Sequence, residues 1–293
     1  MKKIFALGFF DGVHLGHQAL LEACRRLAKE QNCEPAVLTF DIAPTAILQK
    51  THPRMLNTLE DRLMLLGRYG MDHVTVYPAT PQTLSVTWQD FLEDLLRQGA
   101  AGFVCGSDYR FGHKGAGNAQ VLQDFCADRD LPCIIVPEQT MDGEKISSTR
   151  IRSLLEQGQV ETANGLLGHP HILSGKVVSG RQLGRTIGIP TANLLPPAEL
   201  LLPKAGVYAC QVTADGKTYP AVTNIGTRPT VAGDHVTAES FLLDFVGDLY
   251  GKTLQIAFCK FLRPEKKFSS LEELKEEILK NACQTRKFFE KSE

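Results

Sequence analysis

The stretch Gly8–His17, which reads GFFDGVHLGH, constrains the fold of this chain more than any other. It directly follows the apolar run Ile4–Leu7, which we expect to form a buried strand. It directly precedes Gln18–Ala28, where apolar residues recur at helical spacing. A strand, a glycine-rich turn and a helix N-terminus together form an arrangement in which free backbone N–H groups hold phosphate.

The residue types in this turn favour a nucleotide site. Gly8, Gly12 and Gly16 let the backbone lie close to a ligand without Cβ atoms in the way. His14 and His17 are three residues apart at the helix start, so both imidazoles can face one anionic group. The alternative is an ordinary turn with structural histidines. The stretch lacks the G-x4-G-K-[ST] spacing, which excludes the phosphate loop of the common NTPases.

The N-terminal half alternates between apolar strand patterns and helical patterns. We expect helices to begin at Thr58 and Thr87 and a third at Gln120–Asp128. The further expected strands are Ala36–Phe40, His73–Tyr77, Phe103–Cys105 and Cys133–Val136. Continuous apolar strands between helices indicate a parallel sheet covered on both faces. Ligands of such sheets bind at the carboxyl ends of the strands, where Gly8–His17 lies.

The pattern changes at about Asn164–Pro170, where helical periodicity stops. Short strands then follow one another at residues 172–178, 207–212, 218–224, 240–245 and 254–261. Asp215-Gly216 is a strong hairpin signal, and Ser269–Glu272 reads as a capping box before a C-terminal helix. Strands without intervening helices predict a small antiparallel barrel. The expected class is therefore α/β + β, with domains 1–165 and 166–293.

Gly8–His17 resembles the HxGH signature of the nucleotidyltransferase superfamily. Its form is that of the bacterial bifunctional riboflavin kinase/FMN adenylyltransferases, also called FAD synthetases, and the resemblance covers nearly the whole chain. It implies a Rossmann-like HxGH nucleotidyltransferase domain, followed by a riboflavin-kinase β-barrel with a C-terminal helix. The implied reactions are phosphorylation of riboflavin by ATP to FMN, and adenylylation of FMN by ATP to FAD with release of pyrophosphate.

Two further motifs of the N-terminal half are similar to this family. Gly106–Gly112 resembles the motif that helps to form the nucleotide and flavin pocket. Lys145–Arg152 resembles the motif that clamps the triphosphate, and its positive charges lie at a helix N-terminus, where they oppose the macrodipole. The resemblance implies that His14 and His17 are catalytic and that Asp41 and Asp108 contact the flavin. It implies nucleotide binding by Gly8, Asp11, Gly12, Gly16, Lys145, Ser148 and Arg152.

Three motifs carry the resemblance in the C-terminal half. The basic, glycine-rich segment Gly175–Arg185 could be a loose surface loop, but the family implies nucleotide binding by Gly175 and Lys176. The sequence P-T-A-N at 190–193 could be only a turn. Its neutral oxygens suit a hydrated Mg²⁺, and in the family Thr191 and Asn193 hold the Mg-nucleotide. The resemblance makes Glu239 the general base for the riboflavin 5′-hydroxyl and places Asn224 and Arg228 in the flavin site.

Two departures from the family pattern leave alternatives open. Ile42 and Ala43 replace the usual Pro and His, so a riboflavin kinase with an impaired adenylyltransferase domain is one alternative. Phe241 stands where the family usually has His. A flavin-binding regulator is disfavoured because the histidines and Glu239 are retained. A nucleotidyltransferase for another substrate, such as phosphopantetheine, is disfavoured by the barrel half.

Composition narrows the class of partner. The 293 residues carry a formal net charge of −1, which gives no electrostatic argument for nucleic-acid or membrane partners. The eight cysteines form no C-x-x-C pair, which favours buried thiols in a reducing cytoplasm. We expect small-molecule substrates (riboflavin, FMN and ATP), Mg²⁺ as cofactor, a cytoplasmic location, and a monomer or weak homo-oligomer.

Overall fold

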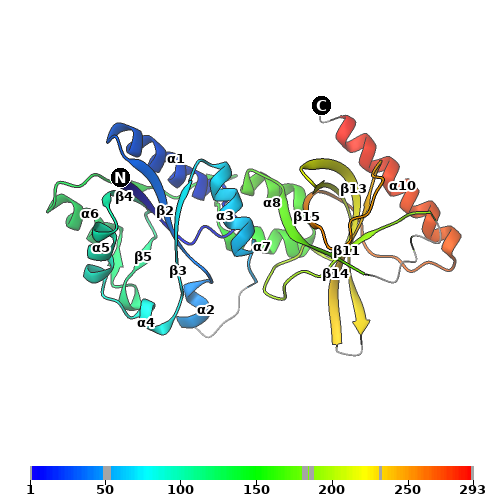
Figure 1. Cartoon of the computed structure of the whole chain (residues 1–293), viewed down its shortest axis with the longest axis horizontal. Coiled ribbons are helices and arrows are strands. Elements are labelled where there is room, and N and C mark those ends of the chain that lie inside the picture. Colours follow the sequence, from blue (N-terminus) through cyan, green and yellow to red (C-terminus); the bar gives the residue numbers. More distant parts are fainter. Residues whose placement is uncertain (1, 49–53, 180–183, 185–187, 231–232, 292–293) are drawn as a thin grey trace. The chain divides into compact units, whose positions relative to one another are not determined.

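The computed structural model describes residues 2–48, 54–179, 184, 188–230 and 233–291, without side chains for 227–230 and 233–235. The chain forms two compact units, Met1–Ser148 and Thr149–Glu293, which we call the first and second units (Figure 1). The eight cysteines are free thiols, and four of them are buried.

The first unit contains a five-stranded parallel sheet, as predicted. Its spatial order is β3-β2-β1-β4-β7. The strands are β1 (Lys3–Leu7), β2 (Glu34–Phe40), β3 (His73–Tyr77), β4 (Ala100–Gly106) and β7 (Cys133–Val136). Strand order reverses between β1 and β4, so the carboxyl ends of these two strands flank the point where doubly wound sheets bind ligands.

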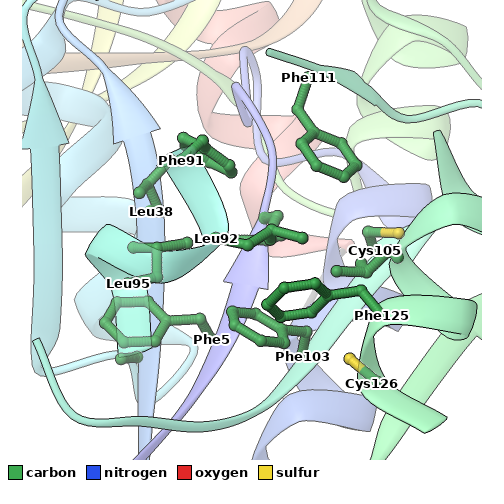
Figure 2. Packing of buried hydrophobic residues seen from close by; sticks show 13 residues of the cluster. Phe5, Leu38, Phe91, Leu92, Leu95, Phe103, Cys105, Phe111, Phe125 and Cys126 are labelled. Atoms are coloured by element: carbon green, nitrogen blue, oxygen red, sulfur yellow. The ribbon is translucent and has the colours of Figure 1, made fainter. Parts of the chain in front are cut away.

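Helices pack on the sheet through apolar side chains. The main helices are α1 (Leu15–Glu30), α3 (Leu59–Arg68), α5 (Trp88–Arg97) and α6 (Ala119–Ala127). Figure 2 shows Phe91 and Leu92 of α5 and Phe125 of α6 among Phe5 and Phe103 of the sheet. Thr58 and Thr87 cap α3 and α5 as expected. Small elements complete the unit: α2 (Pro44–Leu48), α4 (Pro81–Leu84), η1 (His113–Gly115), β5 (Arg110–Phe111), β6 (Gly117–Asn118), β8 (Thr140–Met141) and β9 (Glu144–Lys145).

The second unit contains a closed barrel in the order β10-β11-β14-β13-β12-β15, which confirms the predicted barrel. The strands are β10 (His171–Val178), β11 (Ala192–Leu194), β12 (Gly206–Ala214), β13 (Lys217–Thr230), β14 (Gly233–Leu242) and β15 (Thr253–Arg263). Asp215 and Gly216 adopt φ of 49° and 76° and join β12 to β13 as the predicted hairpin.

Two features of the barrel differ from the prediction. The strand expected to end at Phe245 ends at Leu242, because Asp244 has a φ of 61° that breaks the extended backbone. The short strand β11 was missed, because Ala192–Leu194 lies inside a motif that reads as a turn.

Among the described residues, three helices accompany the barrel: α7 (Ser148–Gln157), α8 (Val160–Leu167) and α10 (Leu271–Glu290). The Asn164 side chain donates to the Phe258 carbonyl at 2.8 Å and accepts from the His171 N–H at 2.8 Å, which fixes α8 on the barrel. The domain border predicted between residues 165 and 166 stays a prediction. The cap of α10 begins one residue later than expected, since Ser270 is the N-cap and bonds the Glu273 N–H.

Candidate active sites

The two histidines of the first turn form one structural unit. His14 is the N-cap of α1, and its Nδ1 accepts a hydrogen bond from the His17 N–H at 3.3 Å. The rings stack with centroids 3.6 Å apart and planes 15° from parallel. Because Nδ1 of His14 is an acceptor, the ring proton of the neutral form is on Nε2.

His17 is held in its neutral form. Burial, the neighbouring His14 and the charge of Arg62 together place the pKa of His17 well below its usual range. Its Nδ1 is buried and has no hydrogen-bond partner among the described residues. A neutral imidazole donates hydrogen bonds without adding charge to the site.

The backbone before α1 contains residues with positive φ, a conformation that is unfavourable for residues other than glycine. Phe10, Gly12 and Val13 have φ of 60°, 83° and 41°. A β-branched residue such as Val13 rarely adopts a positive φ, and such strain clusters at functional sites. A Cβ on Gly16 would lie 3.1 Å from Cε1 of His14, so the absence of a side chain at Gly16 leaves room for the histidine ring.

Asp11 and Ser148 join the turn to distant segments of the first unit. One Asp11 carboxylate oxygen accepts from the Leu56 N–H at 2.9 Å, and the Asp11 carbonyl accepts from the Ser148 hydroxyl at 2.9 Å. Asp11 is 2% exposed. These hydrogen bonds hold the turn in place, and the predicted role of Asp11 and Ser148 in nucleotide binding stays a prediction.

Lys145 and Asp108, which were predicted to bind the triphosphate and the flavin, form an ion pair. The Lys145 ammonium contacts Asp108 at 2.7 Å and also pairs with Glu138 at 2.5 Å. Its hydrogen bonds to Asp108 and Glu138 raise the pKa of Lys145. A triphosphate would therefore compete with two carboxylates for this ammonium. Arg152, on α7, belongs to the second unit, and its role stays a prediction.

Arg62 is a site residue that sequence reasoning missed. It lies on α3, is 1% exposed, and donates to the carbonyl oxygens of Phe9 at 3.1 Å and Phe40 at 2.6 Å. It thereby joins the residues that follow β1 to the end of β2. Its position three and four residues before the buried Leu65 and Leu66 was the available signal, because that spacing places it on the buried face of α3.

In the second unit, three polar side chains stand side by side across three strands. Glu239 of β14 is directly opposite Asn193 of β11 on one side and Asn224 of β13 on the other. Directly opposed residues project to the same face of a sheet, with Cβ atoms about 5 Å apart. The fold thus gathers residues that are distant in sequence, as the family motifs implied.

These side chains line a cavity of about 330 Å³. Its polar lining includes Thr191, Asn193, Asn224 and Glu239, together with Arg263, Glu265, Lys266 and Asn281. Apolar residues of the barrel and of α10 form much of the remainder: Ile189, Val207, Val222, Phe241, Phe268, Leu274 and Ile278. A second cavity of about 240 Å³ shares Thr191 with the first and includes Phe245, Asp248 and Tyr250.

Asn193 offers an oxygen to a ligand. The residue is 7% exposed, its amide nitrogen donates to the Thr191 carbonyl at 3.4 Å, and its buried Oδ1 has no hydrogen-bond partner in the part of the chain that the structure describes. A buried, unpaired carbonyl oxygen costs free energy unless a ligand satisfies it. A hard cation such as Mg²⁺ fits this donor.

The structure gives less support for a functional role of the remaining predicted residues. Gly175 and Lys176 belong to β10, pair with β15 and line neither cavity. Most of the glycine-rich segment after them, including Arg181 and Arg185, lies outside the described residues, as does the side chain of Arg228.

Comparisons with known proteins match both halves. A family model described as FAD synthetase matches residues 1–150, and one described as riboflavin kinase matches residues 167–289. A bifunctional riboflavin kinase/FMN adenylyltransferase from Listeria monocytogenes is 38% identical over 100% of this chain and 94% of its own length. One from Escherichia coli K12 is 39% identical over 98% of this chain and 92% of its own length. The chain belongs to the bifunctional riboflavin kinase/FMN adenylyltransferase family.

A similar solved structure covers both units. It is that of a macrolide-efflux protein from Streptococcus pneumoniae, with a TM-score of 0.88, 32% identity, and coverage of 97% of this chain and 94% of that one. In the part of our chain that the structure describes, no helix is both long and apolar enough to cross a membrane.

The segment that departs from the family pattern, Ile42 and Ala43, is held by the side chain of Asp41. One carboxylate oxygen of Asp41 accepts from the Ile42 N–H at 2.7 Å and from the Ala79 N–H at 2.8 Å. Ala43 is buried, whereas Ile42 is 46% exposed. The match of residues 1–150 to the FAD synthetase model gives no support to the alternative of a riboflavin kinase alone.

Proposed function

We propose that the two units carry consecutive reactions: the second phosphorylates riboflavin to FMN, and the first adenylylates FMN to FAD. The observation that supports the kinase assignment most strongly is the row of Asn193, Glu239 and Asn224 across three strands at the cavity of about 330 Å³. The observation that most strongly supports the adenylyltransferase assignment is the stacked pair of His14 and His17, in which His14 caps α1 after the carboxyl end of β1.

The larger cavity fits the flavin. Its apolar and aromatic walls suit a planar ring system, and its volume lies within the range of small-molecule sites. The neighbouring cavity would take the nucleotide, because it contains Tyr250 and Phe245 for an adenine and adjoins the first at Thr191. Transfer of the γ-phosphoryl group would then occur beside Thr191.

Glu239 is proposed as the general base. A primary alcohol is a poor nucleophile at neutral pH, so a carboxylate that accepts the proton of the riboflavin 5′-hydroxyl assists its attack on the γ-phosphorus. The bond from the γ-phosphorus to the β,γ-bridging oxygen breaks, and ADP leaves. Thr191 and Asn193 would hold Mg²⁺, which neutralises charge on the phosphates when bound.

The adenylyl transfer needs no base, because the attacking FMN phosphate is already an anion. Its oxygen attacks the α-phosphorus of ATP in line, and the bond to the β-phosphate breaks to release pyrophosphate. The contribution of the protein is positioning and stabilisation of charge. Nε2–H of His14 and the neutral His17 would donate to the phosphate oxygens, together with the N-terminus of α1. Gly8, Gly12 and Gly16 would let the phosphates approach the backbone.

The flavin contacts of Asp41, Asp108, Asn224 and Arg228 remain part of this proposal. So do phosphate binding by Lys145, Arg152, Gly175 and Lys176, a monomeric or weakly oligomeric state, and a cytoplasmic location.

A time course tests the two assignments together. The purified protein is incubated with riboflavin and Mg-ATP, and riboflavin, FMN and FAD are separated chromatographically. We expect FMN to rise first and then to be converted to FAD. Accumulation of FMN without FAD, even when FMN and ATP are supplied directly, would leave the kinase alone. Absence of any new flavin would overturn both assignments.

A further inference from the structure

The guanidinium of Arg62 is deeply buried and donates hydrogen bonds to backbone carbonyl oxygens. Its NH1 donates to the Phe9 carbonyl at 3.1 Å, and its NH2 donates to the carbonyls of Phe40 at 2.6 Å and Asp41 at 3.1 Å. These carbonyl oxygens follow β1 or end β2. The guanidinium carbon also lies 4.4 Å from the centroid of the Phe9 ring, so the ring covers one of its faces.

Each of these partners is a neutral carbonyl oxygen. Carbonyl dipoles solvate a buried cation without cancelling its charge, in contrast to a direct carboxylate partner. Burial lowers the pKa of Arg62 to about 10, while the charges of Asp11 and Asp41 act in the opposite direction. The side chain is therefore a cation at neutral pH, and its buried Nε has no hydrogen-bond partner among the residues that the structure describes.

The charge of Arg62 acts on the histidine pair. His17 lies against the stacked ring of His14 and the edge-on ring of Phe10 at 5.3 Å, and Phe10 follows Phe9, whose carbonyl accepts from Arg62. After burial and His14, the charge of Arg62 is a further cause that lowers the pKa of His17. A fixed positive charge close to neutral donors favours an anion bound to those donors. The same guanidinium fixes the Phe9 carbonyl, which also accepts from the Thr39 hydroxyl at 2.8 Å.

We propose that Arg62 is a positioning residue for FAD formation, because it ties the turn after β1, which leads into the histidine pair, to the end of β2 and supplies a buried positive charge to this region. This rests on the proposed role of His14 and His17 as phosphate donors. In this arrangement, Arg62 stabilises negative charge on the phosphates without touching them.

Two variants separate the charge from the hydrogen bonds. Arg62→Lys keeps the charge and loses the planar fork, whereas Arg62→Gln loses the charge but keeps an amide that donates to carbonyl oxygens. The matched control is Arg68→Gln, on the exposed side of the same helix. FMN formation from riboflavin, measured in each full-length sample, reports whether the second unit is intact, and fluorescence of the single tryptophan, Trp88, reports the first unit.

We expect Arg62→Gln to lower kcat/KM of FAD formation from supplied FMN about 100-fold, and Arg62→Lys to retain about tenfold more activity than Arg62→Gln. Arg68→Gln should match the wild type. In full-length protein with ¹³C-labelled histidine, the NMR titration of His17 should shift to higher pH in Arg62→Gln and stay low in Arg62→Lys.

The proposal is overturned if Arg62→Gln is as active as Arg62→Lys, since hydrogen bonding alone would then explain the residue. It is also overturned if the His17 titration is the same in all variants. If Arg62→Gln does not fold, Arg62→Lys decides alone: a His17 pKa raised towards 6.5 in that variant would overturn the role of the charge. Loss of FAD formation in His17→Ala tests the underlying site separately, so the two failures are distinguishable.

Discussion

The rings of His14 and His17 stack with centroids 3.6 Å apart, while Nδ1 of His14 caps the N–H of His17 at 3.3 Å. One residue therefore fixes both the start of α1 and the orientation of the second ring. The pair is arranged before any phosphate arrives, as expected where catalysis depends on positioning.

The first prediction concerns His17→Ala. FAD formation from FMN and ATP should fall about 100-fold or more, because a donor to the transferred phosphate is lost. FMN formation from riboflavin should remain within about twofold of the wild type, since the residues proposed for that reaction lie in the second unit. Both rates are measured chromatographically on the same preparation. Equal loss of both activities would contradict the two-site assignment.

The second prediction uses Gly16. Alanine favours a helix over glycine by about 1 kcal/mol, so Gly16→Ala should not weaken α1 itself. Its Cβ would, however, lie 3.1 Å from Cε1 and 3.2 Å from Nδ1 of the His14 ring. We expect the ring to shift and FAD formation to fall about tenfold, because a small displacement of a positioning group is costly. The measurements are the rate of FAD formation and the midpoint of urea unfolding, which is followed by Trp88 fluorescence.

Gly67→Ala is the matched control for this substitution, because a Cβ there meets no atom within 4 Å. It should leave FAD formation unchanged. Activity of Gly16→Ala equal to that of Gly67→Ala would show that the place of the His14 ring does not matter.

The third prediction concerns Glu239→Gln, a change that keeps the shape and removes the base. Phosphorylation of riboflavin should fall by about 10²- to 10⁴-fold, whereas FAD formation from supplied FMN should persist. A mixture of Glu239→Gln and His17→Ala proteins should convert riboflavin to FAD through free FMN, which neither does alone. Normal riboflavin phosphorylation by Glu239→Gln would exclude it as the base.

The sequence predicted those parts of the sites that are local. The strand, turn and helix around His14 and His17 follow one another directly, so their proximity needed no knowledge of the tertiary fold. The partners of Glu239 were named from family motifs, but their alignment across β11, β13 and β14 depends on barrel register. Arg62 was missed because its role depends on how α3 crosses the ends of two strands. Taken alone, an arginine in an amphipathic helix is expected on the solvated face.

The last prediction concerns stability and pH. His171 is 1% exposed, its Nε2 lies 3.2 Å from the Leu201 carbonyl, and its Nδ1 has no partner. Burial and the nearby His169 lower its pKa to about 4, and the bond to Leu201 only partly offsets this. Between this value and about 6.5, the unfolded chain binds a proton that the folded chain does not. The contribution of His171 to the stability of the second unit is therefore fully present above about pH 6.5 and should fall by about 3 kcal/mol as the pH drops to 4.

His171→Gln isolates this contribution, because the pH dependence of all other groups is shared with the wild type. Urea unfolding of the full-length protein is followed by far-ultraviolet circular dichroism, and Trp88 fluorescence separates the transition of the first unit. We expect the difference in unfolding free energy between wild type and variant to shrink as the pH falls from 6.5 to 4. A difference that is constant over this range would mean that His171 is equally protonated in the folded and unfolded chains, and that its burial does not resist protonation.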